Sequence, residues 1–256
     1  MAEHSSQPQD SPAAIALDGV CFRYPDGVEA LRNVGLHVRI GDRVALVGPN
    51  GSGKSTLLRQ LNGLLTPTSG RVSVMGVSVV RENFTQVRRR VGYVFQDPDD
   101  QLFCPTVLED VAFGPLHLGL PTREVLQCVR QALEWVGLSG YEARVPQRLS
   151  AGEKALVALA TVLSYSADVL VLDEPSASLD PRNRRRLLGV LGSLDRTQLI
   201  ATHDLDFAWE HCARAVLLAE GRVVADGPAR EILADRALLE KHGLELPLIL
   251  QGASPK

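Results

Sequence analysis

The sequence lacks the features that mark membrane-spanning, disulfide-bonded or strongly basic proteins. No apolar run approaches the roughly 18 residues that a membrane-spanning helix needs. The four cysteines are far apart and form no C-x-x-C pair, so we interpret Cys21, Cys104, Cys128 and Cys212 as reduced core or surface thiols. A net charge of −3 provides no general attraction to nucleic acid or to acidic lipid. Residues 1–13 contain Ser, Gln and Pro without the apolar centre of a secretion signal, which predicts a disordered lead-in.

The remaining composition is that of an ordinary globular protein. Apolar residues make up 45% of the 256 residues, and charged residues make up 22%. This length accommodates one large α/β domain, or a core domain with an inserted subdomain. Function therefore has to be inferred from short motifs.

A glycine-rich segment between a predicted strand and a predicted helix is the strongest functional signal. Residues 47–56 contain the pattern G-x-x-x-x-G-K-[ST] and directly follow the apolar run 43–47. In this context backbone N–H groups converge on anionic oxygens at the start of a helix, and glycine permits the close approach. Lys54 is predicted to reach the β- and γ-phosphates of a nucleoside triphosphate, and Ser55 to complete the shell of a Mg²⁺ ion. The predicted phosphate-binding residues are Gly48, Pro49, Asn50, Gly51, Ser52, Gly53, Lys54, Ser55 and Thr56.

The pattern of the rest of the chain predicts strands interrupted by a helical insertion. The segment from Asp97 to about Leu149 turns helical, and an apolar stripe from Val125 to Val136 recurs at three- and four-residue steps. Gly221, between two apolar runs, predicts a hairpin turn. The predicted helix after the phosphate loop covers residues 55 to about 64. The predicted strands cover residues 15–24, 36–40, 44–47, 71–75, 91–95, 169–172, 198–201 and 215–218.

A second candidate site follows the apolar strand at residues 169–172. Asp173 and Glu174 stand at its C-terminal end, which is where open α/β sheets bind their ligands. Asp173 is predicted to hold Mg²⁺ through water, and Glu174 to orient or deprotonate an attacking water. The alternative is two acidic residues that end a strand by accident, and the phosphate loop elsewhere in the chain argues against it.

Six ordered motifs resemble those of ABC-transporter ATPase domains, and the match covers nearly the whole chain, from about residue 15 to 227. They are the phosphate loop, Gln96, Leu149-Ser150-Ala151-Gly152-Glu153, Asp173-Glu174, Ser178-Leu179-Asp180 and Ala201-Thr202-His203-Asp204. Residues 94–103 and 22–27 are similar to the A component of energy-coupling factor (ECF) transporters, in particular to the cobalt and nickel subgroup. The resemblance implies an α/β fold, in which a P-loop NTPase sheet core carries an antiparallel β subdomain and an inserted α-helical subdomain. The expected divisions are an ABC ATPase domain at 14–227, its helical subdomain at about 97–160, and a C-terminal helical extension at 228–256.

The resemblance also implies roles for residues that carry little signal alone. Tyr24 would stack on adenine, although an ordinary strand-edge tyrosine is the alternative. Gln96 would sense the γ-phosphate and Mg²⁺ while it links the sheet to the helical insertion. His203 would contact the γ-phosphate from its strand end. Asp180 would lie at a dimer interface, and this role is compatible with a helix-capping aspartate before Pro181. The expected catalytic residues are thus Glu174, His203 and Gln96, and the expected Mg²⁺ ligands are Ser55, Gln96 and Asp173.

The signature segment departs from the usual L-S-G-G-Q of this family. Ala151 replaces glycine, and Glu153 replaces glutamine. Ser150 and Glu153 predict a capping box, which does not exclude docking of this helix N-terminus on the γ-phosphate held by the opposite subunit. Ser150 and Gly152 keep a hydroxyl and an unobstructed amide for that contact. Ala151 restricts φ, and Glu153 places a carboxylate near a polyanion, so we hypothesise a weakened but working site.

Two other features have less specific interpretations. We interpret two basic clusters as solvated faces because the net charge is negative: Arg88–Arg90, and Arg182 with Arg184–Arg186. Nucleic acid is therefore not an expected partner. By resemblance, residues 97–118 form part of a groove for helices of a membrane partner, with residues 101–103 near the interface. The alternative is that the apolar residues of this segment pack into the protein and form no such groove.

The expected function is ATP hydrolysis that energises an ECF-type importer. Two ATPase subunits, in a homodimer or a heterodimer, would sandwich two Mg·ATP and drive a transmembrane T component and a substrate-binding S component. The chain would lie peripherally on the cytoplasmic side of the cell membrane, and the cargo would be cobalt or nickel ions or a vitamin. The alternatives are a regulatory nucleotide-binding subunit with weakened ATPase paired with an active partner, and a soluble ABC protein acting on nucleic acid or the ribosome.

Overall fold

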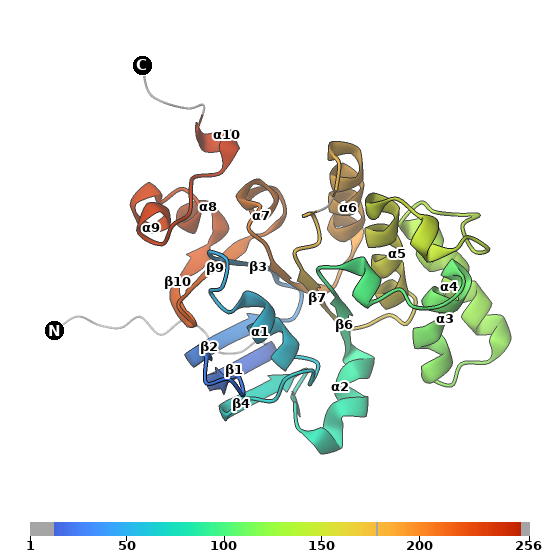
Figure 1. Ribbon diagram of the computed structural model, residues 1–256, viewed down its shortest axis with the longest axis horizontal. Helices are drawn as coiled ribbons and strands as arrows, with labels where there is room; N and C mark the ends of the chain where they lie inside the picture. Colours follow the sequence, from blue (N-terminus) through green and yellow to red (C-terminus); the bar gives the residue numbers. More distant parts are fainter. Residues whose placement is uncertain (1–12, 178, 252–256) are drawn as a thin grey trace.

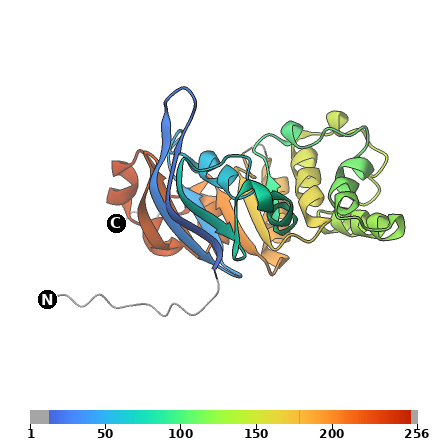
Figure 2. The ribbon, with the colours of Figure 1, turned by 90° about the horizontal axis from the view of Figure 1, so that it is seen from below.

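Two sheets and a helical unit make up the protein. The computed structural model describes residues 13–177 and 179–251 of the 256-residue chain. Figure 1 shows the helical unit of α3 (Val107–His117), α4 (Thr122–Trp135) and α5 (Ala151–Leu163) at one end of the long axis, beyond the sheets. The antiparallel sheet, in blue, lies away from that unit when the molecule is seen from below (Figure 2). The predicted lead-in falls outside the described residues except for Ala13, which opens the first strand and corrects its boundary by one residue.

The central sheet has six strands in the order β10-β9-β3-β8-β7-β6. Five of them run parallel, and β10 pairs antiparallel with β9 at one edge. Glu220 and Gly221, with φ of 49° and 74°, form the turn between β9 and β10, so the predicted hairpin is confirmed. The strands are β3 (Arg43–Val47), β6 (Val91–Val94), β7 (Val169–Asp173), β8 (Thr197–Ala201), β9 (Arg214–Ala219) and β10 (Arg222–Pro228).

Both faces of this sheet are covered, which explains why its strands read as continuous apolar runs. Alternate residues of β3 point to opposite faces: Val44 and Leu46 join the core shared with the antiparallel sheet, α1 and α2. Ala45 and Val47 join the core shared with the helices of the other face, among them α5, α6 and α7.

The antiparallel sheet has the strand order β2-β1-β4-β5. Its second strand starts at Glu29 and not at Leu36 as predicted, and it ends before Ile40, whose side chain is exposed. Register shifts between β1 and β2 interrupt the two-residue period in the first half of the strand, so alternation revealed only its end. The strands are β1 (Ala13–Arg23), β2 (Glu29–Arg39), β4 (Ser69–Val74) and β5 (Val77–Ser78).

The helix after the phosphate loop, α1 (Lys54–Gln60), is shorter than predicted. The Asn62 side chain accepts a hydrogen bond from the Leu64 N–H, and Gly63 has a φ of 69°. These two residues turn the chain away from the helix axis, so the predicted continuation to Leu64 is wrong.

The helical unit contains α3 (Val107–His117), α4 (Thr122–Trp135) and α5 (Ala151–Leu163), with the short turns η2 (Pro98–Asp100) and η3 (Pro146–Arg148). The apolar stripe predicted on the middle helix packs into the core, except for Leu126, which is 37% exposed because it lies one position beyond the buried face. In the part of the chain that the structure covers, no helix is both long enough and apolar enough to cross a membrane.

The remaining helices lacked a clear apolar period in the sequence and were not predicted individually. In α6, for example, four arginines fill the first turns and only three residues are buried. Asp206 of α7 accepts hydrogen bonds from the N–H groups of Leu248 and Ile249, which fixes the start of α10 against α7. These helices are η1 (Arg81–Asn83), α2 (Phe84–Arg90), α6 (Pro181–Ser193), α7 (Leu205–His211), α8 (Ala229–Ile232), α9 (Arg236–Lys241) and α10 (Leu248–Gln251).

Candidate nucleotide-binding site

The phosphate loop connects the C-terminal end of β3 to α1, at the edge of the sheet where the parallel strands end. Gly48 and Gly53 have φ of 155° and 105°, and both lie against neighbouring backbone. A Cβ atom on Gly48 would collide with the carbonyl oxygen of Leu218, and one on Gly53 would lie 2.6 Å from the carbonyl oxygen of Ala30. The sequence therefore folds this loop into a conformation that only glycine at these positions permits, as predicted.

Lys54 is buried within this loop and bonds to its backbone. Its Nζ donates to the carbonyl oxygens of Gly48 at 2.8 Å and Pro49 at 3.1 Å. Burial lowers the pKa of the Lys54 ammonium, and the negative charges of Glu174 and Asp173 oppose that effect. The ammonium thus closes the loop on itself and faces two carboxylates across the site.

Ser55 and Asp173 meet beside the loop, as the sequence predicted for two oxygen donors of one site. The Ser55 hydroxyl donates to Asp173 Oδ1 at 2.9 Å, and the Tyr93 hydroxyl donates to Oδ2 at 3.2 Å. Burial raises the pKa of Asp173, whereas the hydrogen bonds from Ser55 and Tyr93 lower it. A hydroxyl and a buried carboxylate beside a phosphate cradle form a hard oxygen donor set, so these residues suit Mg²⁺.

Glu174 and His203 form a pair at the ends of β7 and β8. The His203 ring Nδ1 lies 2.7 Å from Glu174 Oε2, and the His203 backbone N–H donates to the same oxygen at 3.1 Å. The Glu174 side chain is 7% exposed, whereas that of His203 is 58% exposed. Glu174 also has a φ of 50°, a left-handed conformation that side-chain-bearing residues seldom adopt and that is common at functional sites.

Lys54, Ser55, Glu174 and His203 line one cleft of about 720 Å³ at the carboxyl ends of the strands, and Asp173 is connected to it through its hydrogen bond with Ser55. The cleft brings together Tyr24, the loop residues 50–56, Gln96, Glu174 and His203. The Tyr24 hydroxyl lies 2.9 Å from Thr56 Oγ1, and its ring packs edge-on against Phe22. Most of the predicted site residues therefore converge, although they come from segments far apart in the chain.

One hydrogen-bonded link between the sheet and the helical unit is made by Gln101, whereas this role was expected of Gln96. The Gln101 side chain accepts a hydrogen bond from the Phe95 N–H and donates to the Ala158 carbonyl oxygen and to Thr161 Oγ1 of α5. Residues 101–103 were expected near a partner interface, but Gln101 points into the helical unit and Leu102 is buried. Phe103 is 63% exposed and packs edge-on against Phe113, so it alone of the three presents its side chain to solvent. An isolated glutamine gives no pattern from which its contacts could be predicted.

The signature segment begins α5, and the predicted capping box is confirmed. Ser150 Oγ accepts from the Glu153 N–H, and Glu153 Oε2 accepts from the Ser150 N–H at 2.9 Å. The Tyr141 hydroxyl donates to Glu153 Oε1 at 2.7 Å, and Arg144 lies 3.9 Å from that oxygen. The Tyr141 hydrogen bond, followed by those from Ser150, lowers the pKa of Glu153. None of the residues 150–153 lines the cleft.

Asp180 caps α6 by accepting from the N–H groups of Arg182 and Asn183, so the capping prediction is confirmed. Ser178 of the same motif falls outside the residues that the structure describes. The prediction of a solvated basic face is wrong for Arg184, whose side chain is 22% exposed and bonds to Asp204 and Glu210. Arg186 of the same run also donates to the Gly137 carbonyl oxygen, and the run of arginines in the sequence did not distinguish these two from their exposed neighbours Arg182 and Arg185.

Comparison with known proteins agrees with this geometry. The sequence profile of the family described as "ABC transporter" matches residues 31–177. A putative ABC transporter ATP-binding protein of Geobacter sulfurreducens is 54% identical over 238 residues, which cover 93% of this chain and 96% of that protein. The energy-coupling factor transporter ATP-binding protein EcfA of Methanothermobacter thermautotrophicus is 45% identical, with 91% of this chain and 76% of that protein covered. The solved structure of cbiO1 from Clostridium perfringens, described as part of the ABC transporter complex cbiONQ, superposes with a TM-score of 0.79 at 36% identity, and covers 93% of this chain and 98% of that one.

Proposed function

The chain belongs to the ABC transporter family and is an ATPase, and from this premise we propose that it is the ATP-hydrolysing subunit of an ECF-type importer. The observation that carries the proposal is the convergence of three groups on one cleft. These groups are the phosphate loop with Lys54, Ser55 with Asp173 hydrogen-bonded to it, and the Glu174–His203 pair.

The cleft has the groups that in-line attack of water on a γ-phosphate requires. Lys54 and the loop N–H groups bind the phosphates, and Tyr24 offers a flat ring for the adenine. Ser55, Asp173 and Gln96 would hold Mg²⁺, which neutralises phosphate charge when bound. Glu174 orients the attacking water and accepts its proton, while His203 holds the Glu174 carboxylate and contacts the γ-phosphate. The low exposure of Glu174 keeps its carboxylate away from bulk water.

The proposed working unit is a pair of ATPase subunits, in a homodimer or a heterodimer. The signature residues 150–153 lie outside their own chain's cleft. Ser150 and Ala151 are exposed at a helix N-terminus and are therefore available to a partner. A second subunit would supply this N-terminus to the γ-phosphate and close the cleft. Asp180, exposed at the start of α6, would lie in the same interface.

We further propose that closure of the pair moves a membrane-embedded T component, with an S component selecting the cargo. The support is the similarity to EcfA and to cbiO1 of the cbiONQ complex. The exposed Phe103–Phe113 pair is the proposed contact for the membrane component, from the cytoplasmic side of the cell membrane. Cobalt or nickel ions, or a vitamin, are the proposed cargo.

Co-purification of the full chain with the membrane proteins encoded beside it tests this function. We expect a stable complex that hydrolyses Mg·ATP and takes up cargo in vesicles, with Phe103→Ser weakening assembly while nucleotide affinity stays within about twofold, because Phe103 lies outside the nucleotide cleft. Recovery of RNA or ribosomal proteins in place of membrane proteins would contradict the proposal and favour a soluble ABC protein. Hydrolysis that requires a second, different ATPase chain and survives Glu174→Gln in this chain would favour the regulatory-subunit alternative.

Replacing Glu153 by glutamine should raise the steady-state ATPase rate of the assembled complex by roughly two- to fivefold. One partly exposed negative charge beside the partner's γ-phosphate costs about 0.5–1 kcal/mol. Glutamine keeps one oxygen that accepts from the Ser150 N–H, and its NH2 group can donate to the Tyr141 hydroxyl oxygen in place of the bond that Oε1 accepts. Glu124→Gln, an exposed change on α4, is the matched control. An unchanged rate would show that Glu153 does not weaken the site.

A further inference from the structure

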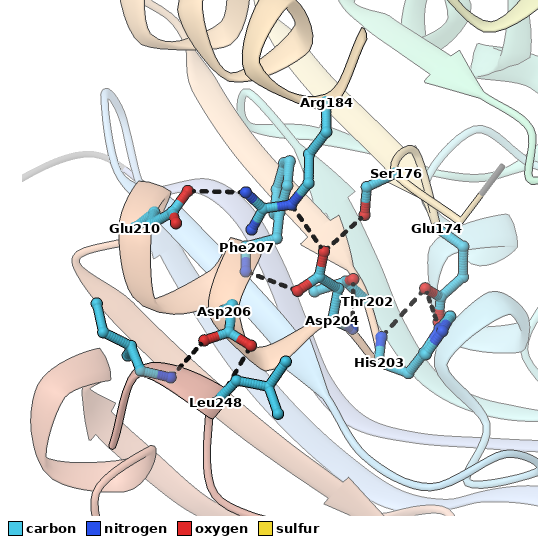
Figure 3. A network of polar contacts seen from close by, with 11 residues as sticks. Glu174, Ser176, Arg184, Thr202, His203, Asp204, Asp206, Phe207, Glu210 and Leu248 are labelled. Carbon is cyan, nitrogen blue, oxygen red and sulfur yellow. Dashed lines mark hydrogen bonds and ion pairs between the residues drawn. The ribbon is translucent and has the colours of Figure 1, made fainter. Parts of the chain in front are cut away.

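Asp204, next to His203, connects three segments of the site (Figure 3). Its Oδ1 accepts from the Phe207 N–H and thereby caps α7. Its Oδ2 accepts from the Ser176 hydroxyl at 3.5 Å, which ties it to the loop that follows Glu174. Its own N–H donates to Thr202 Oγ1 at 3.0 Å. Asp204 therefore fixes the backbone on the C-terminal side of His203.

Arg184 supplies the third segment, because it lies one turn into α6. Its Nε donates to Asp204 Oδ2 at 3.1 Å, and one terminal nitrogen donates to Glu210 Oε2 at 3.0 Å. The guanidinium also lies 5.8 Å from the centre of the Phe207 ring. Burial lowers the pKa of Arg184, but the hydrogen bonds and charges of Asp204 and Glu210 outweigh it and raise that pKa. The arginine thus clamps α6 to the start of α7 (Figure 3).

The clamp connects the two ends of a short path through the subunit. At one end, Asp180 begins α6 and Arg184 donates its N–H to the Asp180 carbonyl oxygen. At the other end, the His203 backbone N–H and ring both contact Glu174 Oε2. A displacement of α6 therefore moves Asp204, and with it the peptide that aims His203 at Glu174.

We propose that Arg184 is a positioning residue for hydrolysis, which acts through Asp204 to set the position of His203 against Glu174 and couples it to the placement of α6. It touches neither nucleotide nor the attacking water. This inference rests on the proposed function, in which α6 begins at the subunit interface and Glu174 activates water. Its consequence is that the arginine controls the rate of cleavage and not the affinity for nucleotide.

The test compares Arg184→Met, which keeps the aliphatic stem over Phe207, with Arg184→Lys, which keeps the charge. In the full chain purified with its membrane partner, we expect kcat of Arg184→Met to fall about tenfold, with KM for Mg·ATP within about twofold. Arg184→Lys should recover a large part of kcat. Glu210→Gln is the matched control, because it removes the other partner of the same arginine on an exposed side of α7, and its kcat should stay within about twofold.

A double-mutant cycle then tests the path through Asp204. Asp204→Asn keeps an N-cap for α7 but removes the charge that Arg184 binds. If Arg184 acts through Asp204, the double variant Arg184→Met/Asp204→Asn should lose about as much kcat as either single variant. Multiplicative losses of kcat in the double variant would overturn the positioning role. A fall in both kcat and Tm together with a rise in KM in Arg184→Met would also overturn it. A wild-type complex without ATP hydrolysis would refute the proposed function itself, whereas an active wild type with an equally active Arg184→Met would refute only this inference.

Discussion

Replacing Glu174 by glutamine should lower kcat for ATP hydrolysis by about three orders of magnitude while Mg·ATP binding is retained. Glutamine has the same shape and can still accept a hydrogen bond from the His203 N–H, but it cannot take a proton from water. Because binding proceeds and cleavage does not, the closed pair of subunits should accumulate. Single-turnover kinetics and size-exclusion chromatography with Mg·ATP measure the two effects.

Glu220 provides a matched control for this change. It is an exposed glutamate at the rim of the same cleft, and its φ of 49° is close to the 50° of Glu174. Glu220→Gln removes the same charge from the same type of backbone, so its kcat should stay within about threefold of wild type. A Glu174→Gln enzyme that keeps more than a tenth of the wild-type kcat would mean that another group accepts the proton.

Replacing Lys54 by methionine should raise the Kd for Mg·ATP by about 100-fold or more. A hydrogen bond between charged groups contributes about 1.5–3 kcal/mol, and the Lys54 ammonium can form more than one with the β- and γ-phosphates. The bonds that Nζ makes to the Gly48 and Pro49 carbonyl oxygens place the ammonium within the loop. Calorimetric titration with Mg·ATP gives the Kd directly.

Lys241→Met, on the exposed face of α9, removes the same charge far from the loop and should leave the Kd within about twofold. The Tm of both variants should be measured without nucleotide. Lys54→Met that binds Mg·ATP as tightly as wild type would contradict the assignment of residues 48–56 as the phosphate cradle. A large drop in Tm would instead identify Lys54 as a structural residue of the loop.

The site was predictable from sequence where a motif encodes its own geometry. The glycine spacing around Lys54 specifies a loop and its ligand, and the apolar strand before Asp173 places two carboxylates at a sheet edge. The capping interactions of Ser150 and Asp180 are local, so residue type and spacing predicted them correctly. The fold class followed from the same motifs and the family that they resemble.

Features that depend on distant contacts were not predictable. The inward turn of Arg184 requires Asp204 and Glu210, which follow it by 20 and 26 residues. Gln101 likewise binds α5 through Ala158 and Thr161, and nothing in its local sequence indicates this. The first half of β2 was missed because register shifts remove the alternation on which the prediction depended.

The left-handed backbone of Glu174 has a consequence for attempts to make this protein more heat-resistant. Glutamate gives up about 1 kcal/mol in that conformation, whereas asparagine gives up less and glycine none. Selection for thermal tolerance alone would therefore favour Glu174→Gly or Glu174→Asn, and would enrich well-folded proteins that no longer turn over. Directed evolution of this protein therefore needs ATP turnover as a second criterion, because thermal stability and catalysis favour different amino acids at residue 174.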